Sequence, residues 1–316
     1  NALNQLVKTI EPTLESMVYE YDDNGNLIKQ EYFSADLSKS EKIEYVFNNM
    51  DQLIQTKEYR TTNGVLTPYF TTNTYTKFGE LASVQDPTGY TILYQYDDMG
   101  NKIHADHGDQ NEIEYEYDKN SRLIQVVYST RNLDLYNQFT ITETYEYYRD
   151  GKLRLYVPNQ PANNNTETKK VYYYYQNDQL SSKVTTLSKV INDQEVISDQ
   201  DTVNYLYDQS GQLTELSDKL GKTLNYYDES SNLTQQIRID QLVTYDNDHN
   251  ELTRVDQTSQ TVGYSYDSYH NQTAIIYPDN TIVVYEYDEL QRLSSVTDQN
   301  GTTIYTYDTD DNEQIE

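Results

Sequence analysis

A short phrase, Tyr-x-Tyr-Asp followed by a polar turn and a leucine, recurs along this 316-residue chain. It stands at Tyr19–Leu27 and again at Tyr285–Leu293. A fixed repeat constrains a fold strongly, because every copy has to form the same small structural unit. When the second tyrosine of each phrase is taken as the marker, thirteen copies can be placed, at Tyr21, Phe47, Tyr75, Tyr96, Tyr117, Tyr147, Tyr174, Tyr207, Tyr227, Tyr245, Tyr266, Tyr287 and Tyr307. The basic unit has about 20 residues, and the wider gaps, such as the one that contains Pro158–Thr166, are predicted to be enlarged loops.

Each unit is predicted to be a β-hairpin. Ile282–Tyr287 is rich in β-branched and aromatic residues, which favour strands, and Leu293–Thr297 is a second short run of the same kind. Polar turns, Asp288–Gln291 and Asp298–Gly301, follow the two runs. One unit therefore contains two strands and two turns.

The two tyrosines of a phrase lie two residues apart, so on a strand they project from the same face. The residue between them, such as Glu116, Glu146 or Glu286, faces the other way. We therefore expect one aromatic face, packed into the sheet, and one acidic face in water. The expected tyrosine ladder, a structural site, consists of Tyr19, Tyr21, Tyr94, Tyr96, Tyr115, Tyr117, Tyr145, Tyr147, Tyr205, Tyr207, Tyr264, Tyr266, Tyr285, Tyr287, Tyr305 and Tyr307.

The aspartate after the second tyrosine is expected to start the turn, because its carboxylate can accept hydrogen bonds from backbone N–H groups just downstream. Four residues past the marker, a positive φ would be natural. That slot holds Gly25, Gly79, Gly100, Gly151 and Gly211, and elsewhere Asp51, Asp178, His249 and His270. The second turn likewise begins with an aspartate and ends with a glycine, at Asp86–Gly89, Asp218–Gly221 and Asp298–Gly301.

The composition limits how these hairpins can be stabilised. Leu, Ile, Val and Phe make up only about a fifth of the chain, near the disordered range, so a thick core is poorly supported. The 35 tyrosines must supply much of the buried surface. Because a lone hairpin is marginal in water, the units should stack side by side. We predict an all-β fold of antiparallel hairpin repeats in a twisted, spiralling sheet that forms part of a hollow shell or tube.

The charge balance excludes some functions. With 23 basic and 52 acidic residues the formal charge is −29, which would repel nucleic acids. Cysteine is absent, so neither disulfides nor thiol chemistry is available. No apolar run approaches the roughly 20 residues that span a bilayer, so membrane insertion is not expected.

These phrases resemble a known family. Tyr19–Leu27 and Tyr205–Leu213, with Asp86–Gly89 between units, are similar to the YD repeat of Rhs proteins, wall-associated polymorphic toxins, insecticidal toxin-complex proteins and teneurins. The resemblance covers essentially the whole chain and implies a β-sheet that spirals into a hollow shell. In bacterial toxins such a shell encloses a C-terminal toxic domain, and in teneurins it forms an extracellular scaffold. The self-cleaving Asp-Pro-x-Gly-Leu core signature has no counterpart, because Asp86–Tyr90 lies early and ends in tyrosine, so we interpret it as a turn.

Residues 1–316 are expected to be one repeat segment with no separate catalytic domain. Leu6–Thr9 has the character of a second strand whose first strand is missing, and the last copy, at Tyr307, stops just past its turn. The predicted partners are therefore neighbouring repeats of a longer chain, and the family resemblance implies an enclosed toxin domain as a further partner.

No catalytic, cofactor or metal site is predicted. His249 and His270 occupy turn slots, and His104-Ala-Asp-His107 has the spacing of a weak metal pair that is more often simply exposed. Gly221-Lys-Thr223 lacks the upstream glycine and the following helix of a phosphate-binding loop. Asp246–Asn250 and Asp308–Asn312 begin like calcium loops but lack the glycine at the sixth position, so calcium remains a weaker alternative.

The predicted function is a non-enzymatic scaffold, a segment of a YD-repeat shell that encloses or displays a toxin or effector domain of a secreted or cell-surface, bacterial protein. The alternatives are an extracellular filament, formed by self-association, and a carbohydrate-binding adhesin. For glycan binding, the candidates are the aromatic residues outside the repeat register, namely Tyr69, Phe70, Tyr128, Tyr136 and Phe139.

Overall fold

The computed structural model describes residues 5–36, 40–62, 65–108, 111–132, 137–161, 167–191, 194–245 and 251–307. These residues form 24 strands and no helix, so the predicted all-β fold is confirmed. The strands are β1 (Leu6–Ile10), β2 (Ser16–Tyr21), β3 (Leu27–Phe33), β4 (Ser40–Phe47), β5 (Leu53–Thr62), β6 (Val65–Tyr75), β7 (Leu81–Gln85), β8 (Thr91–Tyr96), β9 (Lys102–Asp106), β10 (Glu112–Tyr117), β11 (Leu123–Asn132), β12 (Asn137–Tyr147), β13 (Leu153–Pro161), β14 (Thr168–Gln176), β15 (Gln179–Ile191), β16 (Gln194–Tyr207), β17 (Leu213–Asp218), β18 (Gly221–Tyr227), β19 (Leu233–Tyr245), β20 (Glu251–Tyr266), β21 (Gln272–Ile276), β22 (Ile282–Tyr287), β23 (Leu293–Asp298) and β24 (Gly301–Tyr307).

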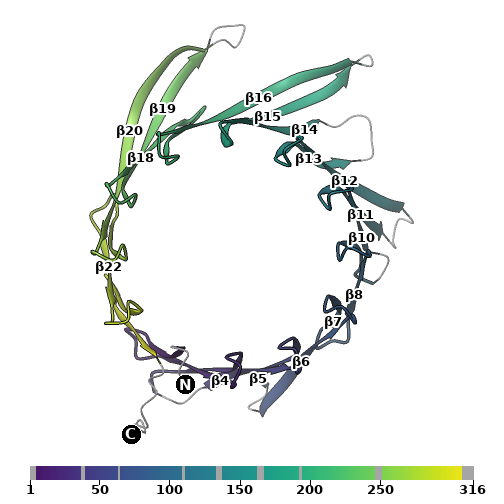
Figure 1. Cartoon of the computed structure of the whole chain (residues 1–316), viewed down its shortest axis with the longest axis vertical. Coiled ribbons are helices and arrows are strands. Elements are labelled where there is room, and N and C mark those ends of the chain that lie inside the picture. Colours follow the sequence, from purple (N-terminus) through teal and green to yellow (C-terminus); the bar gives the residue numbers. More distant parts are fainter. Residues whose placement is uncertain are drawn as a thin grey trace. The chain divides into compact units, whose positions relative to one another are not determined.

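The chain divides into two compact units. One is built from Asn1–Ile92 and Tyr264–Glu316, and the other from Leu93–Gly263. Within each unit the strands pair antiparallel with their neighbours in sequence, as β9 to β19 do in the second unit (Figure 1). Among the described residues no strand packs face to face on another strand of its unit. Each unit is therefore a single layer of sheet.

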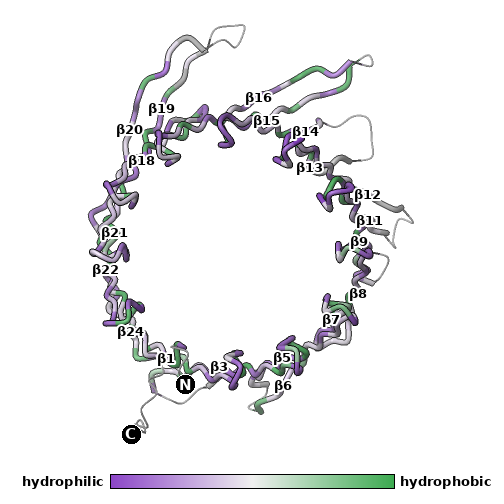
Figure 2. Tube along the Cα trace, viewed as in Figure 1, coloured by the Kyte–Doolittle hydropathy of each residue, from purple (hydrophilic) through white to green (hydrophobic). Residues whose placement is uncertain are grey.

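A single layer leaves both faces open to water. Among the described apolar side chains, only Ala105, Val126 and Val171 are buried. Hydrophilic and hydrophobic residues alternate along the strands of each unit (Figure 2). The low aliphatic content of the sequence thus corresponds to an ordered sheet without a thick core.

One hairpin in the first unit is assembled from the two ends of the sequence. The last strand, β24, pairs antiparallel with the first, β1. Leu6 lies opposite Tyr307, just as Leu27 lies opposite Tyr21 in an ordinary repeat. The half repeat at the start of the chain and the half repeat at its end therefore pair with each other.

We call the turn after each marker residue the YD turn, and the turn between one repeat and the next the second turn. Most YD turns have the length of Asp22–Asn26. There the Oδ1 atom of Asp22 accepts hydrogen bonds from the N–H groups of Asn24, at 3.0 Å, and Asn26, at 2.8 Å. The same two bonds are made by Asp97, Asp118, Asp208, Asp228, Asp267 and Asp288. The predicted role of this aspartate is confirmed.

The expected positive φ is also found. Gly25, Gly79, Gly100, Gly151, Gly211, Asp51, Asp178 and His270 all have it, as do Gly89, Gly221 and Gly301 in second turns. Ser121, Ser231 and Gln291 adopt it in the same slot, although their residue types do not favour it. His249 lies outside the described residues.

Two of the thirteen markers depart from the expected repeat. Tyr245 pairs with Glu251 after a register shift, as a marker does, but it ends β19, a continuous strand that begins at Leu233, so no second turn separates it from the repeat of Tyr227. The marker at Tyr174 is displaced by one residue, because Tyr175 pairs with Leu180 through a YD turn of only two residues, Asn177 and Asp178. Both errors arose because the spacing of tyrosines was used where the strand length had changed.

The widened repeats were predicted to contain enlarged loops, but most of the added residues lengthen strands. Strands β15 and β16 have 13 and 14 residues, and β19 and β20 have 13 and 16. Pro158 to Pro161 belong to β13, and residues 162–166 lie outside the described part. The added length points toward the second turns, so the hairpins β15–β16 and β19–β20 extend past β17 and β18 (Figure 1).

Candidate functional site

The tyrosine ladder lies on the first strand of each hairpin. Its members sit at the ends of β2, β8, β10, β12, β16, β20, β22 and β24. The rings of Tyr285 and Tyr287 are half-buried, whereas Glu286 between them is exposed. The same alternation holds at the other seven pairs, with Glu20, Gln95, Glu116, Glu146, Leu206, Ser265 and Thr306 as the exposed residues.

The second tyrosine of a repeat is bonded to the repeat before it. The hydroxyl of Tyr147 donates to the backbone carbonyl of Leu123, at 2.7 Å, across β11 and β12. Matching bonds are Tyr21 to Leu6, Tyr75 to Leu53, Tyr117 to Lys102, Tyr227 to Leu213, Tyr287 to Gln272 and Tyr307 to Leu293. We call this bond the tyrosine clasp. Its acceptor is always the first residue of the second strand in the preceding repeat.

Burial of these rings affects their chemistry. It raises the pKa of Tyr147 and Tyr307 above the ordinary value of a tyrosine. The guanidinium of Arg122 lies 4.7 Å from the ring centre of Tyr147, and that of Arg292 lies 4.5 Å from the ring centre of Tyr307. The clasp tyrosines therefore remain protonated donors at neutral pH.

The YD turns of successive repeats are also linked. The Nε2 atom of Gln52 donates to the carbonyl of Gly79, at 3.1 Å, and Gln179 donates to Gly211 in the same way, at 2.9 Å. Gln5, in the half repeat at the start of the chain, donates to Gly25 at 3.0 Å. Gln52 is the last residue of its YD turn, Gln179 directly follows the two-residue turn Asn177–Asp178, and every acceptor is the positive-φ glycine of the next YD turn.

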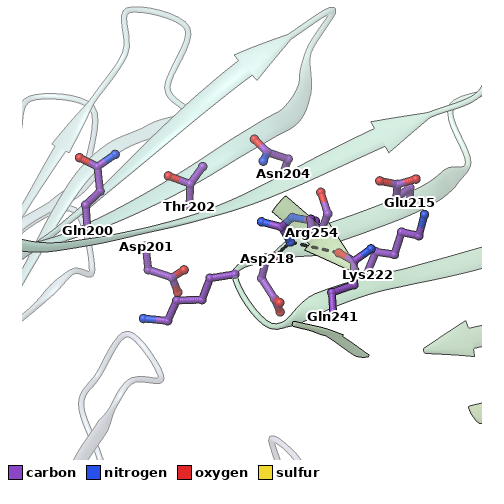
Figure 3. Close-up of a pocket in the computed structure, with 11 residues that line it drawn as sticks. Gln200, Asp201, Thr202, Asn204, Glu215, Asp218, Lys222, Gln241 and Arg254 are labelled. Carbon is purple, nitrogen blue, oxygen red and sulfur yellow. Dashed lines mark hydrogen bonds between the residues drawn. The ribbon is translucent and has the colours of Figure 1, made fainter. Parts of the chain in front are cut away.

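A groove of about 530 Å³ opens at the base of the two long hairpins of the second unit (Figure 3). One wall is the edge of β16, from Gln200 to Asn204, and the other is formed by Gln241 and Arg254 of the β19–β20 hairpin. The second turn between β17 and β18 forms the floor, where Asp218 and Lys222 lie. The groove exists because β17 ends at Asp218, while β16 and β19 continue outward.

The groove is polar and carries both signs of charge. Arg254 donates to the carbonyl of Asp218, at 2.8 Å, and to the side chain of Gln241, at 3.1 Å, which fixes the long hairpin to the floor (Figure 3). Lys219 and Lys222 make no ion pair within the described residues. The Oδ1 atom of Asp201 is buried without a hydrogen-bond partner there. Such an arrangement can bind polar main-chain or hydroxyl groups.

A second groove, of about 410 Å³, lies on β2 to β5 in the first unit. Its lining includes Met17, Tyr32, Glu58 and Arg60. Arg60 makes two hydrogen bonds with the Glu58 carboxylate, at 2.9 and 2.8 Å. Its guanidinium lies 5.2 Å from the ring centre of Tyr69. An aromatic ring beside a fixed pair of polar groups is an arrangement that suits a sugar ring.

Sequence reasoning missed both grooves, although it named Tyr69 beside the second. The useful signal for the first was the short turn Asp218–Gly221 between two widened repeats, since a short hairpin between long ones must leave a gap. Of the other off-register aromatics, Phe70 and Tyr128 are exposed. Tyr136 lies outside the described residues, and Phe139 is in β12.

The predicted weak metal motifs are not assembled into a site in the described part of the chain. No group of three His, Cys, Asp or Glu residues there could hold a metal ion. The Nε2 atom of His104 lies 3.7 Å from the Glu112 carboxylate, and its Nδ1 atom is buried without a partner. The calcium-like segments 246–250 and 308–312 lie outside the described residues. The described residues also contain no helix that is long and apolar enough to cross a membrane.

Comparison with known proteins gives matches at the level of structure alone. No model of a known protein family matches the chain, and no curated protein is similar to it. Among solved structures, the chain is similar to the Photorhabdus luminescens Tc holotoxin pore, with 16% identity over 91% of this chain and 18% of that chain, and a TM-score of 0.43. A TcdB2-TccC3 structure without its hypervariable C-terminal region matches with 16% identity over 92% and 18%, and a TM-score of 0.42. A porin-like protein from Bacteroides uniformis matches with 15% identity over 96% of both chains, and a TM-score of 0.23. The chain thus spans about a fifth of the length of the toxin-complex chains.

Proposed function

We propose that this chain is a structural scaffold, a segment of a YD-repeat wall that encloses or displays a toxin or effector domain of a secreted or cell-surface bacterial protein. The observation that carries the proposal is the single-layer sheet, in which hydrogen bonds between repeats replace a core. The clasp from Tyr147 to Leu123 and the turn link from Gln179 to Gly211 represent these bonds. Such a sheet is suited to forming a thin wall.

The repeat resemblance of the sequence suggests the enclosed domain. A wall of this kind would keep proteases from its contents, and the charge of −29 would keep its surface soluble. The expected partners are further repeats and the enclosed domain itself.

Electron microscopy of the chain in its native assembly tests the proposal. Closed particles with internal density are expected. Uniform filaments would instead favour the alternative scaffold, an extracellular fibre, and particles that are closed but empty would contradict enclosure. A protease digest at 37 °C gives an independent test, because cleavage of the folded repeats within minutes would contradict a protective wall.

A second candidate function, glycan binding, is favoured by the groove that contains Tyr32 and the Glu58–Arg60 pair. Aromatic rings stack on sugar faces, while an arginine and a carboxylate can bond neighbouring hydroxyl groups. Saturation-transfer NMR with a panel of neutral oligosaccharides tests this function. Signal that is lost in Tyr32→Ala but kept in Phe70→Ala would support it, and no signal with any sugar would exclude it for that panel.

A further inference from the structure

The gap beside the β15–β16 hairpin contains an open strand edge. Strand β16 pairs with β17 only from Asn204 to Tyr207, and over Gln194–Val203 its partner among the described residues is β15 alone, on the other side. The N–H of Gln200 is bonded to the carboxylate of its own neighbour Asp199, at 2.9 Å, so it is directed away from β15. Because alternate residues of an antiparallel strand direct their main-chain groups to the same edge, those of Thr202 face the gap too. An edge of this kind is a template for another strand.

The groove at the base of the long hairpins lies in the plane of the sheet, next to this edge. Asp201 projects from the face of β16 that carries the ladder tyrosines, whereas Gln200 and Thr202 project from the opposite face (Figure 3). All three line the groove. A pocket on one face would be lined from that face alone, so this groove occupies the place of a further strand beside β16. Such a strand would lie in line with β17, beyond its last residue, Asp218.

The space is wide enough for one strand and its side chains. Only β17 and β18 separate β16 from β19, so with neighbouring strands about 4.8 Å apart, β16 and β19 lie roughly 14 Å apart at the base of the gap. The hairpins that border the gap diverge outward (Figure 1). On the far side, Arg254 donates to the carbonyl of Asp218, which fixes the β19–β20 hairpin to the floor. The site that is open to a partner is therefore the edge of β16.

Carboxylates without a counter-charge mark one face of this edge. Asp199 and Asp201 project from the same face, and neither makes an ion pair within the described residues. Lys183, diagonal to Asp201 on β15, makes no ion pair there either. The Oδ1 atom of Asp201 is buried without a hydrogen-bond partner in the described part of the chain. A carboxylate that is partly withdrawn from water favours the approach of a cation. The opposite face offers Gln200 and Thr202, which are polar and uncharged.

The edge differs in charge from the floor of the groove. Between Gln194 and Val203 every charged residue is acidic. At the floor both signs occur, because Glu215 and Lys222 are diagonal neighbours on one face in the register of β17 and β18, and Lys219 belongs to the turn. A strand bound along the edge therefore meets negative charge, and only its inner end meets the mixed charges of the floor.

From this geometry we infer that the β16 edge binds an extended, basic segment of another protein by antiparallel strand addition. The segment carries basic residues at alternate positions, opposite the two unpaired carboxylates, and small polar residues between them. On binding, the N–H of Gln200 exchanges the carboxylate of Asp199 for a carbonyl of the segment, and that carboxylate is released to a cation. Further out, where Val196 and Ile197 are 44% and 55% exposed, the segment is apolar.

Fluorescence anisotropy with a labelled peptide tests the inference. The probe is acetyl-Thr-Lys-Thr-Lys-Thr-Val-Val-Thr-amide with the fluorophore at its outer, C-terminal end. It is added to the whole chain in physiological salt, where exposed charges more than about 8 Å apart are largely screened. Saturable binding is expected. An isomer with adjacent lysines, Thr-Thr-Lys-Lys-Thr-Val-Val-Thr, places one lysine on each face and should bind about tenfold more weakly. Equal binding of the two peptides, or no saturable binding of the probe, would overturn the inference.

Methylation of the peptide backbone distinguishes strand addition from simple charge attraction. N-methylation of the first two threonines removes the N–H groups that should face Thr202 and Gln200, and it should abolish saturable binding. N-methylation of the two lysines alters N–H groups on the other edge of the peptide and should leave the affinity almost unchanged. Equal effects of the two modifications would contradict strand addition.

Variants of the chain locate the site. Asp201→Asn should weaken binding about tenfold, because the lysine opposite it loses a charged partner. The matched control Glu116→Gln removes the same charge from an exposed position on β10 and should bind as the wild type does. A variant whose β17–β18 hairpin is lengthened by several residue pairs between Asp218 and Gly221 covers the edge from within the chain and should not bind. Binding that survives this covering would overturn the inference. Self-association of the wild type that the same lengthening abolishes would also overturn it, because a second copy would then occupy the edge.

Discussion

The YD turns and the second turns connect the strands at opposite ends, and the YD turns vary less in length. Most YD turns repeat the length and the bonds of Asp22–Asn26. The second turn between β17 and β18 has two residues and joins short strands. At the same end of the sheet, other hairpins are extended by strands of more than 12 residues. The difference indicates that turn length is more uniform where the same bonds to the next repeat recur, with the two-residue YD turn before Gln179 as an exception.

The physical reason lies in what each YD turn touches. Its aspartate closes the turn, its last residue is bonded to the following turn, and the strand that leads into it carries a clasp tyrosine. At Arg122, for example, one side chain bonds Asp118, at 2.7 Å, and the carbonyl of Tyr148, at 3.2 Å. An inserted residue there would break several bonds at once, so we expect insertions to be tolerated only in second turns.

Matched insertions should separate the two kinds of turn most strongly. Four Gly-Ser residues between Glu289 and Leu290 would disrupt the bonds of Asp288 and the position of Arg292. We expect a loss of about 3 kcal/mol, since several hydrogen bonds of about 1 kcal/mol each are broken. The same insertion between Gln299 and Asn300 should cost about 1 kcal/mol or less. Urea unfolding followed by circular dichroism measures both, and equal losses would refute the comparison.

Gly221→Ala tests whether a second turn between two long hairpins is as constrained as a YD turn. A Cβ atom at Gly221 would lie 2.1 Å from the carbonyl oxygen of Ile239, and the residue has a φ of +152°. We expect a loss of about 2 kcal/mol from strain and from the forced backbone shift. At Gly89, also in a second turn, nothing lies within 4 Å of an added Cβ. Gly89→Ala should therefore cost only about 1 kcal/mol, and a larger loss at Gly89 than at Gly221 in the same urea assay would contradict this account.

The clasp can be tested by removing one hydroxyl group. Tyr147→Phe deletes the bond to the carbonyl of Leu123 and should cost about 1 kcal/mol. Tyr174 is 46% exposed and makes no clasp, so Tyr174→Phe should have almost no effect on the urea midpoint. If both variants unfold like the wild type, the clasp contributes nothing to the link between repeats.

The pH dependence of the stability should distinguish the turns from the clasps, and we expect the smallest effect per residue in this test. The side chain of Asn101 and backbone N–H groups bond the Asp97 carboxylate and hold its pKa below the usual value of 3.8. The stability that this aspartate contributes is therefore present above pH 3.8 and is lost as the pH falls through its lower, folded-state pKa. The urea midpoint of the wild type should exceed that of Asp97→Asn at pH 7, and the difference should shrink toward pH 3. A difference that does not change with pH would show that the carboxylate charge is irrelevant to the turn.

Alkaline pH affects the clasp tyrosines instead of the turn aspartates. Burial raises the pKa of Tyr117 and Tyr287 above 10.0. A tyrosine with a raised pKa contributes stability that is present below pH 10 and lost as the pH rises through the folded-state pKa. Unfolding at high pH should therefore follow ionisation of the clasp tyrosines, which absorbance near 295 nm can monitor.

Much of this architecture could be predicted from the sequence because each repeat encodes its own strands and turns. The positive φ of Ser121 follows from its place in the repeat, even though serine does not favour it. The pairing of Leu6 with Tyr307 was not predicted, since periodicity specifies which residues form strands but not which distant strands meet. The grooves could not be predicted for a related reason. They depend on unequal strand lengths, and the tyrosine spacing marks the strand beginning at Leu233 as two repeats.

The clasp also bears on how such a chain can change in evolution. Each repeat supplies one donor, the tyrosine hydroxyl, and one acceptor, a main-chain carbonyl. That carbonyl belongs to Leu123 in one repeat, Lys102 in another and Gln272 in a third, so the acceptor residue can mutate freely. A duplicated repeat would bond to both neighbours without leaving an unsatisfied group. Tandem duplication and deletion can therefore alter the number of copies in a gene of this kind while every remaining repeat keeps its bonds.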